Sequence, residues 1–111
     1  MTLPEIDPRA EMAILSGDPA VASELYVIRF RIFAGIDVAP HWHPEDEHIT
    51  VIEGAFGIGY GDSFVADTMT MLLPGAYLLI PKGVRHFSRY EAGTVVQVHG
   101  KGPLETHYVT S

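Results

Sequence analysis

The 111-residue sequence contains no cysteine. Disulfide bonds, thiolate nucleophiles and sulfur-ligated metal sites are therefore excluded, and any metal must be held by nitrogen and oxygen atoms. Basic residues are also scarce, since seven Lys and Arg stand against fourteen Asp and Glu, for a formal net charge of −7. Nucleic-acid binders need a basic stripe, and anionic lipid repels a chain of this charge. We therefore expect neither nucleic acid nor a membrane as a partner.

Long hydrophobic runs are missing as well. The longest apolar stretch, MLLPGAYLLIP at residues 71–81, is interrupted by Pro74 and Gly75 and is too short to span a bilayer. The N-terminal stretch MTLPEIDPRAEM carries acids where a signal peptide needs a basic flank and an apolar run. These features predict a soluble, cytoplasmic protein.

Amphipathic helical periodicity is also lacking, and the chain instead shows short runs rich in Val, Ile, Leu, Phe and Tyr, separated by Gly and Pro. These runs cover residues 24–33, 48–54, 55–61, 68–73, 76–81, 85–90, 94–100 and 106–110. Many short strands at even spacing predict an all-β fold, an antiparallel sandwich or small barrel with a single core. We expect residues 24–111 to form the barrel domain, and residues 1–23 to pack on the barrel or on a partner subunit.

The stretch HWHPEDEH, residues 41–48, holds three of the six histidines. On a strand His41 and His43 leave the same face, because side chains alternate. Glu47 lies where the chain resumes as a strand, so two imidazoles and a carboxylate can meet in a barrel mouth, a donor set that divalent metals accept. A solvated acidic loop is the alternative interpretation of this stretch alone. A zinc-protease helix is excluded, because H-E-x-x-H is absent and Pro44 disfavours a helix.

A second stretch, GAYLLIPKGVRHFSRY at residues 75–90, reads as a turn, a buried strand, a Pro-Lys-Gly turn and a strand that begins near His86. Glycines at chain reversals often supply positive φ angles. Turns at Gly75 and at 81–83 make the chain double back. The reversal can return His86 to the mouth that His41 and His43 face.

Together the two stretches resemble the two conserved motifs of the cupins. The first motif, G-x5-H-x-H-x3-E-x6-G, is matched by Gly35, His41, His43, Glu47 and Gly54, and the second, G-x5-P-x-G-x-x-H, by Gly75, Pro81, Gly83 and His86. The resemblance covers residues 35–90. It implies a small single-domain cupin of the RmlC-like superfamily, a jelly-roll β-barrel (double-stranded β-helix). It also implies that the four His and Glu residues of these motifs bind one divalent transition metal ion per chain.

The metal cannot be identified from its ligands, because imidazole and carboxylate suit Fe, Mn, Ni, Co, Cu and Zn alike. One position departs from the cupin pattern: the Asn that usually follows the second-motif histidine by four residues is Tyr90 here. By alternation His86, Ser88 and Tyr90 share a face, so we expect the phenol of Tyr90 to lie in the substrate pocket.

Two further pocket candidates, Gln97 and His99, share one face of the 94–100 run, opposite Val96 and Val98. They either line the mouth, where they would orient the metal ligands or transfer protons, or point to solvent. His107 is predicted to be a surface or packing residue.

An ion held by three histidines and one carboxylate in an octahedral arrangement has two adjacent open positions, as catalytic sites do. We therefore expect a metal-dependent enzyme, a dioxygenase acting on a small oxygen-chelating organic substrate. Isomerase or lyase chemistry is an alternative, because small cupins of the same fold cover all of these. A non-catalytic protein that binds or senses a small ligand is a further alternative. We also expect a homodimer, which would cover exposed sheet edges.

Overall fold

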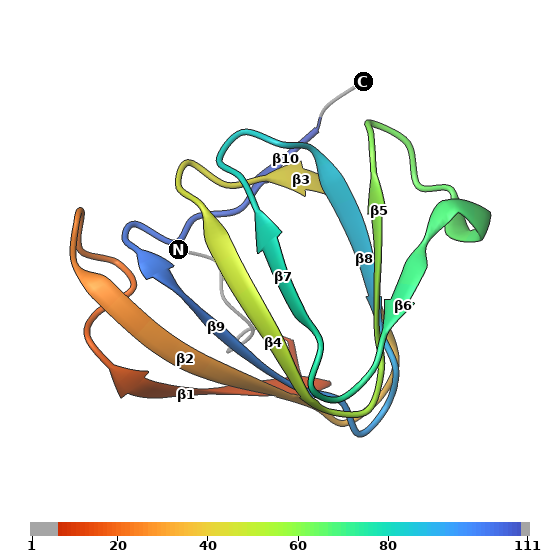
Figure 1. Ribbon diagram of the computed structural model, residues 1–111, viewed down its shortest axis with the longest axis horizontal. Helices are drawn as coiled ribbons and strands as arrows, with labels where there is room; N and C mark the ends of the chain where they lie inside the picture. Colours follow the sequence, from red (N-terminus) through yellow and green to blue (C-terminus); the bar gives the residue numbers. More distant parts are fainter. Residues whose placement is uncertain (1–6, 110–111) are drawn as a thin grey trace.

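The computed structural model describes residues 7–109, which form two five-stranded antiparallel sheets (Figure 1). The first sheet contains, in spatial order, β1 (Ala10–Ser16), β2 (Leu25–Ile32), β9 (Val95–Lys101), β4 (Glu47–Glu53) and β7 (Tyr77–Ile80). The second contains β10 (His107–Tyr108), β3 (Ile36–Trp42), β8 (His86–Tyr90), β5 (Phe56–Tyr60) and β6 (Thr70–Leu72). A short 3₁₀ turn, η2 (Ala66–Thr68), precedes β6. The all-β prediction is confirmed.

Each of the eight predicted runs overlaps an observed strand. No helix within residues 7–109 has the length and hydropathy that crossing a bilayer requires.

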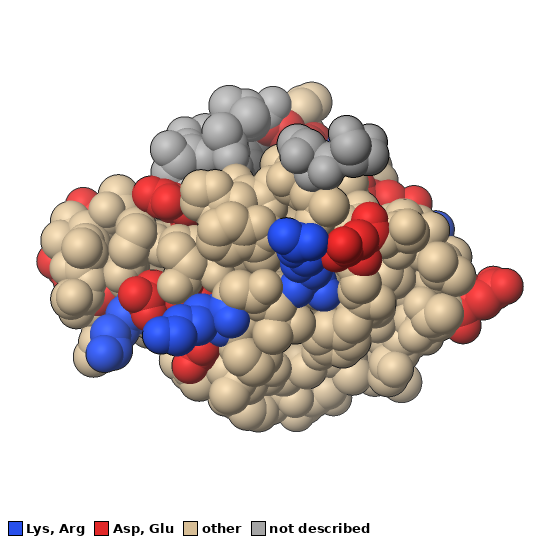
Figure 2. Space-filling model, turned by 90° about the horizontal axis from the view of Figure 1, so that it is seen from above, with Lys and Arg blue, Asp and Glu red and all other residues tan. Residues whose placement is uncertain are grey.

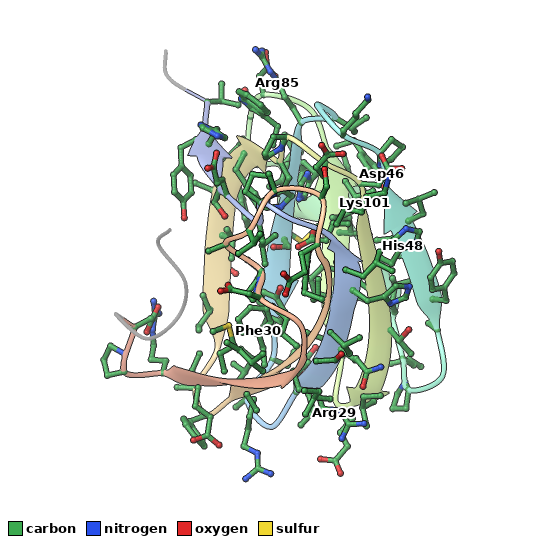
Figure 3. All side chains as sticks on the ribbon, turned by 90° about the vertical axis from the view of Figure 1, so that its left-hand side faces the viewer. Arg29, Phe30, Asp46, His48, Arg85 and Lys101 are labelled. Carbon is green, nitrogen blue, oxygen red and sulfur yellow. The ribbon has the colours of Figure 1, made fainter. Side chains whose placement is uncertain are left out.

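The core lies between the two sheets and follows from the alternation of each strand. On β2, Ile28 and Ile32 are buried, whereas Arg29 and Arg31 are exposed. Ile49 and Val51 on β4 and Val96 and Val98 on β9 are likewise buried. Phe30, also on β2, is buried and lies between the two sheets (Figure 3). Burial of these apolar side chains stabilises the sandwich by roughly 1.5–3 kcal/mol each.

Strand β1 is not predicted by the sequence, yet it forms the edge of the first sheet. Its residues pair antiparallel with β2, from Ala10 opposite Ile32 to Ser16 opposite Val27. Most of its side chains are exposed, so a period-two apolar pattern is absent from this segment. Residues 1–6 lie outside the described residues, and the proposed division of the chain at residue 24 stays a prediction.

The ligand-bearing strand β3 contains Pro40, and its pairing with β8 shifts register between Val38 and His41. Beyond this irregularity His41 lies directly opposite His86. A proline removes a ladder hydrogen bond and is tolerated in a strand at such irregular points. The bulge therefore sets the register that brings two predicted ligands together.

Candidate metal centre

The four predicted ligands lie at the ends of three strands at one end of the sandwich. His41 is near the end of β3, His43 follows that strand, Glu47 begins β4 and His86 begins β8. All four side chains are buried, with at most 8% of any residue exposed. Polar groups are rarely buried this completely without a partner, so the cluster needs a structural or functional reason.

Three of the four form one compact group. One ring nitrogen each of His41, His43 and His86 lie within 4.8 Å of one another. The ring centroids of His41 and His86 are 4.1 Å apart, and the ring centroid of His43 is 5.1 Å from that of His41 and 5.2 Å from that of His86. Glu47 is outside this group of three and lies beside His43, with Oε1 3.3 Å from Nε2. The three histidines can therefore hold a metal ion, with a carboxylate next to them.

Backbone carbonyls fix the tautomer of each histidine. Nδ1 lies 2.6 Å from the oxygen of Ala39 in His41, 2.8 Å from that of Glu105 in His43, and 3.0 Å from that of Val84 in His86. A carbonyl oxygen only accepts, so each Nδ1 carries the proton and donates it. In the neutral form of each ring, the lone pair is therefore on Nε2, as metal-binding histidines require.

Burial keeps two of these histidines neutral. It lowers the pKa of His41 to about 4, helped by the nearby His86, and it also lowers the pKa of His86. A buried imidazole loses the hydration that stabilises its charged form. Both rings are thus ready to coordinate well below the ordinary pKa of histidine.

The pair of His43 and Glu47 behaves differently. Burial alone would lower the pKa of His43 and raise that of Glu47, but their hydrogen bond and mutual attraction outweigh it. The pKa of His43 is therefore raised, and that of Glu47 is lowered. Glu47 stays a carboxylate, and His43 is the imidazole that most readily takes up a proton. Neutral imidazoles with one carboxylate fit a borderline divalent metal such as Fe, Mn, Co, Ni, Cu or Zn.

Two hydrogen bonds hold the turn before His86 close to the other predicted ligands. The N–H of Gly83 donates to the carbonyl of His43 at 2.9 Å, and the N–H of Lys82 donates to Oδ1 of Asp46 at 2.8 Å. Gly83 has a φ of +76°, in the left-handed region that glycine adopts freely. The turn between β7 and β8 is thus tied to the turn between β3 and β4. The chain reversal predicted at residues 81–83 is confirmed.

A cavity of about 550 Å³ opens between the sheets, and all four residues line it. Its apolar wall includes Phe30, Ile32, Ile36, Ile49, Phe56 and Leu104. Pockets of this size and character are typical of small-molecule sites.

Tyr90 and Ser88 also line the cavity, on the face of β8 that carries His86, as predicted. The ring of Tyr90 packs on Phe56, with centroids 4.9 Å apart. Burial and the negative charge of Glu47 raise the pKa of Tyr90, so its phenol keeps its proton. Tyr90 can therefore donate a hydrogen bond to a ligand in this cavity.

The structure does not bring Gln97 or His99 to the cavity. Both lie on the outer face of the first sheet, because Val96 and Val98 take the inner face of β9. Gln97 accepts a hydrogen bond from Nε of Arg29 at 2.8 Å. The ring of His99 stacks on His48 with centroids 4.6 Å apart, and Figure 3 shows His48 on this outer side.

The ends of the described chain supply cavity residues that the sequence analysis missed. Asp7 and Arg9 come from the N-terminal segment, and Thr106 and Tyr108 come from the C-terminal segment. Tyr108 on β10 pairs with His41 on β3, which carries the C-terminal segment to the metal centre. Neither segment has a motif or a clear period that would have pointed to the site. His107 is exposed and stacks on Trp42, as predicted for a surface or packing residue.

Charged side chains do not form a basic surface on the face seen in Figure 2. Blue and red groups lie beside each other there, and most of the face is uncharged. This distribution lacks the continuous basic stripe that nucleic-acid binding needs.

No protein-family profile matches the sequence, and no curated protein matches it. Solved structures do match. An RmlC-like cupin from Desulfovibrio desulfuricans is similar at 21% identity over 84% of this chain and 82% of its own, with a TM-score of 0.62. The polyketide cyclase RemF from Streptomyces resistomycificus is similar at 19% identity over 94% and 73%, with a TM-score of 0.72.

A third similar structure is a salicylate 1,2-dioxygenase from Pseudoaminobacter salicylatoxidans in complex with gentisate. It shares 18% identity over 88% of this chain but only 26% of its own, with a TM-score of 0.68. Likeness at such identities shows the fold. The chain therefore has a cupin fold, in agreement with its two motifs, and the fold alone does not choose among activities.

Proposed function

We propose that this chain is a metal-dependent enzyme that holds one divalent transition metal ion through His41, His43, Glu47 and His86. The observation that carries the proposal is the set of three hydrogen bonds from Nδ1 to backbone carbonyls, which turns each Nε2 toward the cluster, with that of His43 beside the buried carboxylate of Glu47. A purely structural role for such a cluster would leave Nε2 of His41 and of His86 without a purpose beside the cavity. Orientation of each ring by a second hydrogen bond is the usual arrangement around metals.

We propose dioxygenase-type chemistry on a small organic substrate that presents two neighbouring oxygens. A bound divalent ion polarises chelated oxygen atoms and, where it is redox-active, gives access to dioxygen chemistry. The protein's own part is to orient and enclose the substrate. The apolar wall of the cavity excludes water, and Tyr90 offers a protonated hydroxyl to a substrate oxygen on which charge develops.

Isomerase or lyase chemistry at the same site is the second candidate, favoured by the similarity in fold to a polyketide cyclase. A protein that binds or senses a small ligand without turnover is the third. The same ligands and the same cavity serve all three, so the reaction must be measured.

The test begins with protein purified without a polyhistidine tag and analysed for metal. Oxygen consumption is then screened with catechols, enediols and diketones after loading with Fe, Mn, Ni, Co, Cu or Zn. Uptake of oxygen that depends on both metal and substrate supports the dioxygenase. Conversion of substrate without oxygen uptake supports isomerase or lyase chemistry, and tight ligand binding without conversion supports the binding protein.

We further propose that the chain forms a homodimer. Both edge strands of the first sheet carry exposed apolar side chains, Ile14 and Leu15 on β1 and Tyr77 and Leu79 on β7. Exposed edges of this kind favour pairing with another chain. Sedimentation at micromolar concentration should give the mass of two chains, and a monomer there would count against the proposal.

A further inference from the structure

The charged side chains that line the cavity outside the metal centre are already paired with opposite charges. Arg9 and Asp7 form a fork, with Nε 3.1 Å from Oδ1 and a terminal nitrogen 2.9 Å from Oδ2. Asp37 is held in the same way by Arg89, at 2.7 and 3.1 Å. Arg9 is the only Lys or Arg among the described residues that line the cavity. Residues 1–6 and 110–111 contain no Lys or Arg either.

The remaining polar groups of the cavity are neutral hydroxyls. Ser88, Tyr90, Thr106 and Tyr108 line it together with the apolar wall. These groups can hydrogen-bond to a ligand but cannot neutralise a carboxylate, sulfonate or phosphate. An anionic group taken into such surroundings loses its hydration without gaining a partner, which is costly.

Outside the metal centre, the charged side chains of the cavity are thus already engaged in ion pairs, and the rest of the lining is hydroxyl or apolar. A substrate can present its two oxygens to the four predicted ligands. Its remaining part must contact apolar side chains and hydroxyls, with Arg9 turned toward Asp7 instead of toward the ligand.

Resting on the proposed function, we propose that the substrate of this site carries its chelating oxygens at one end and is otherwise uncharged and apolar. Asp7 acts as a specificity-determining residue in this arrangement. Its carboxylate engages the one cavity-lining arginine, which would otherwise attract anionic substituents. A ligand that carries an anionic group remote from its chelating oxygens should therefore bind more weakly.

The first experiment does not require metal in the site. It measures the binding of two fluorescent probes to the purified full chain, and the metal content of the same protein is measured alongside. N-phenyl-1-naphthylamine is neutral, and 8-anilinonaphthalene-1-sulfonate is the same ring system with a sulfonate. Their dissociation constants are compared for the parent, for Asp7→Asn and for Asp62→Asn. The last is a matched control, because Asp62 also pairs with an arginine, Arg85, at 3.1 Å, and neither residue lines the cavity.

The neutral probe should bind the parent at least about tenfold more tightly than the sulfonate. Asp7→Asn should tighten sulfonate binding by about three- to fivefold, as expected for a half-exposed charge pair, and leave the neutral probe unchanged. Asp62→Asn should change neither constant. Equal affinity of the parent for the two probes would overturn the proposal, as would equal effects of the two Asn variants.

A second experiment compares ligands with the same chelating head on metal-loaded protein, by isothermal titration calorimetry. 4-Ethylcatechol should bind at least about tenfold more tightly than 3,4-dihydroxybenzoate, whose tail is a carboxylate. Tighter binding of the acid with the metal retained would overturn the inference about substrate charge while leaving the metal site intact. Failure of the chain to load metal would instead overturn the proposed function, and the probe experiment would still decide the charge preference.

Discussion

His43 and Glu47 form a buried pair, with Nε2 of the imidazole 3.3 Å from Oε1 of the carboxylate. Nδ1 of the same ring donates to the carbonyl of Glu105, so both ring nitrogens of His43 have an acceptor beside them. A carboxylate here favours the protonated imidazole when no metal is present, and it favours a metal cation for the same electrostatic reason. The pair thus links the protonation of His43 to the binding of a metal ion at the site.

Glu47→Gln should therefore lower the pKa of His43. The native pKa is raised because attraction to Glu47 outweighs burial, and without the carboxylate burial prevails. A pH titration of the metal-free protein by NMR of the histidine rings measures this directly. An unchanged pKa of His43 in the variant would mean that the carboxylate does not act on this ring.

Metal affinity should fall on acidification by about tenfold per pH unit below the raised pKa of His43, because one proton competes with the ion. His41, with a pKa of about 4, and His86, whose pKa is also lowered, stay neutral over most of this range. Chelator competition between pH 7 and about pH 4.5 gives the slope. A flat profile would contradict ligation by His43, and a slope near a thousandfold per unit would show that three histidines protonate together.

Tyr90→Phe should preserve the fold and the metal while weakening substrate binding or turnover. The ring that packs on Phe56 is retained, and only the hydroxyl in the cavity is removed. Loss of one hydrogen bond to a neutral ligand costs about 0.5–1.5 kcal/mol, a roughly two- to tenfold effect. Kinetics or calorimetry with the substrate found by the oxygen screen provides the measurement. Parent-like values would make Tyr90 a packing residue.

Gly54→Ala should destabilise the protein more than Gly93→Ala. Both glycines have positive φ, +79° and +84°, so each substitution carries a left-handed strain of about 1–2 kcal/mol. A Cβ on Gly54 would in addition lie 2.6 Å from Cα of Thr94, whereas one on Gly93 would meet nothing within 4 Å. This clash adds about 1–3 kcal/mol. Equal free energies of unfolding by denaturant for the two variants would show that the loop at Gly54 relaxes.

The convergence of His41, His43 and His86 could be predicted from the resemblance of two stretches of the sequence to the cupin motifs. Spacing and turn residues alone show only that the chain reversal can return His86 to the other two histidines. Alternation on β2 and β4 predicts which side chains are buried. The carbonyl partners of the rings could not be predicted in the same way. Glu105 is 62 residues from His43, and only the folded chain shows that they meet.

Other features depend on information that a period-two pattern does not contain. The pattern of β9 separates Gln97 and His99 from Val96 and Val98, but it does not say which pair faces the cavity. Burial of the two valines decides it. Strand β1 is held at a sheet edge by pairing with β2, and its exposed side chains leave no pattern to detect.

The most direct test of the account is the metal content of His86→Ala beside that of His48→Ala. Both changes remove one histidine, but His86 belongs to the group of three within 4.8 Å, whereas His48 lies on the outer face of the first sheet and stacks on His99. Changes in groups around metal ligands already cost 10–100-fold in affinity, so loss of a ligand should cost at least about a hundredfold. Untagged parent and His48→Ala should each retain about one ion per chain by elemental analysis, and His86→Ala should retain almost none. Equal metal content in the two variants would contradict the proposed metal centre.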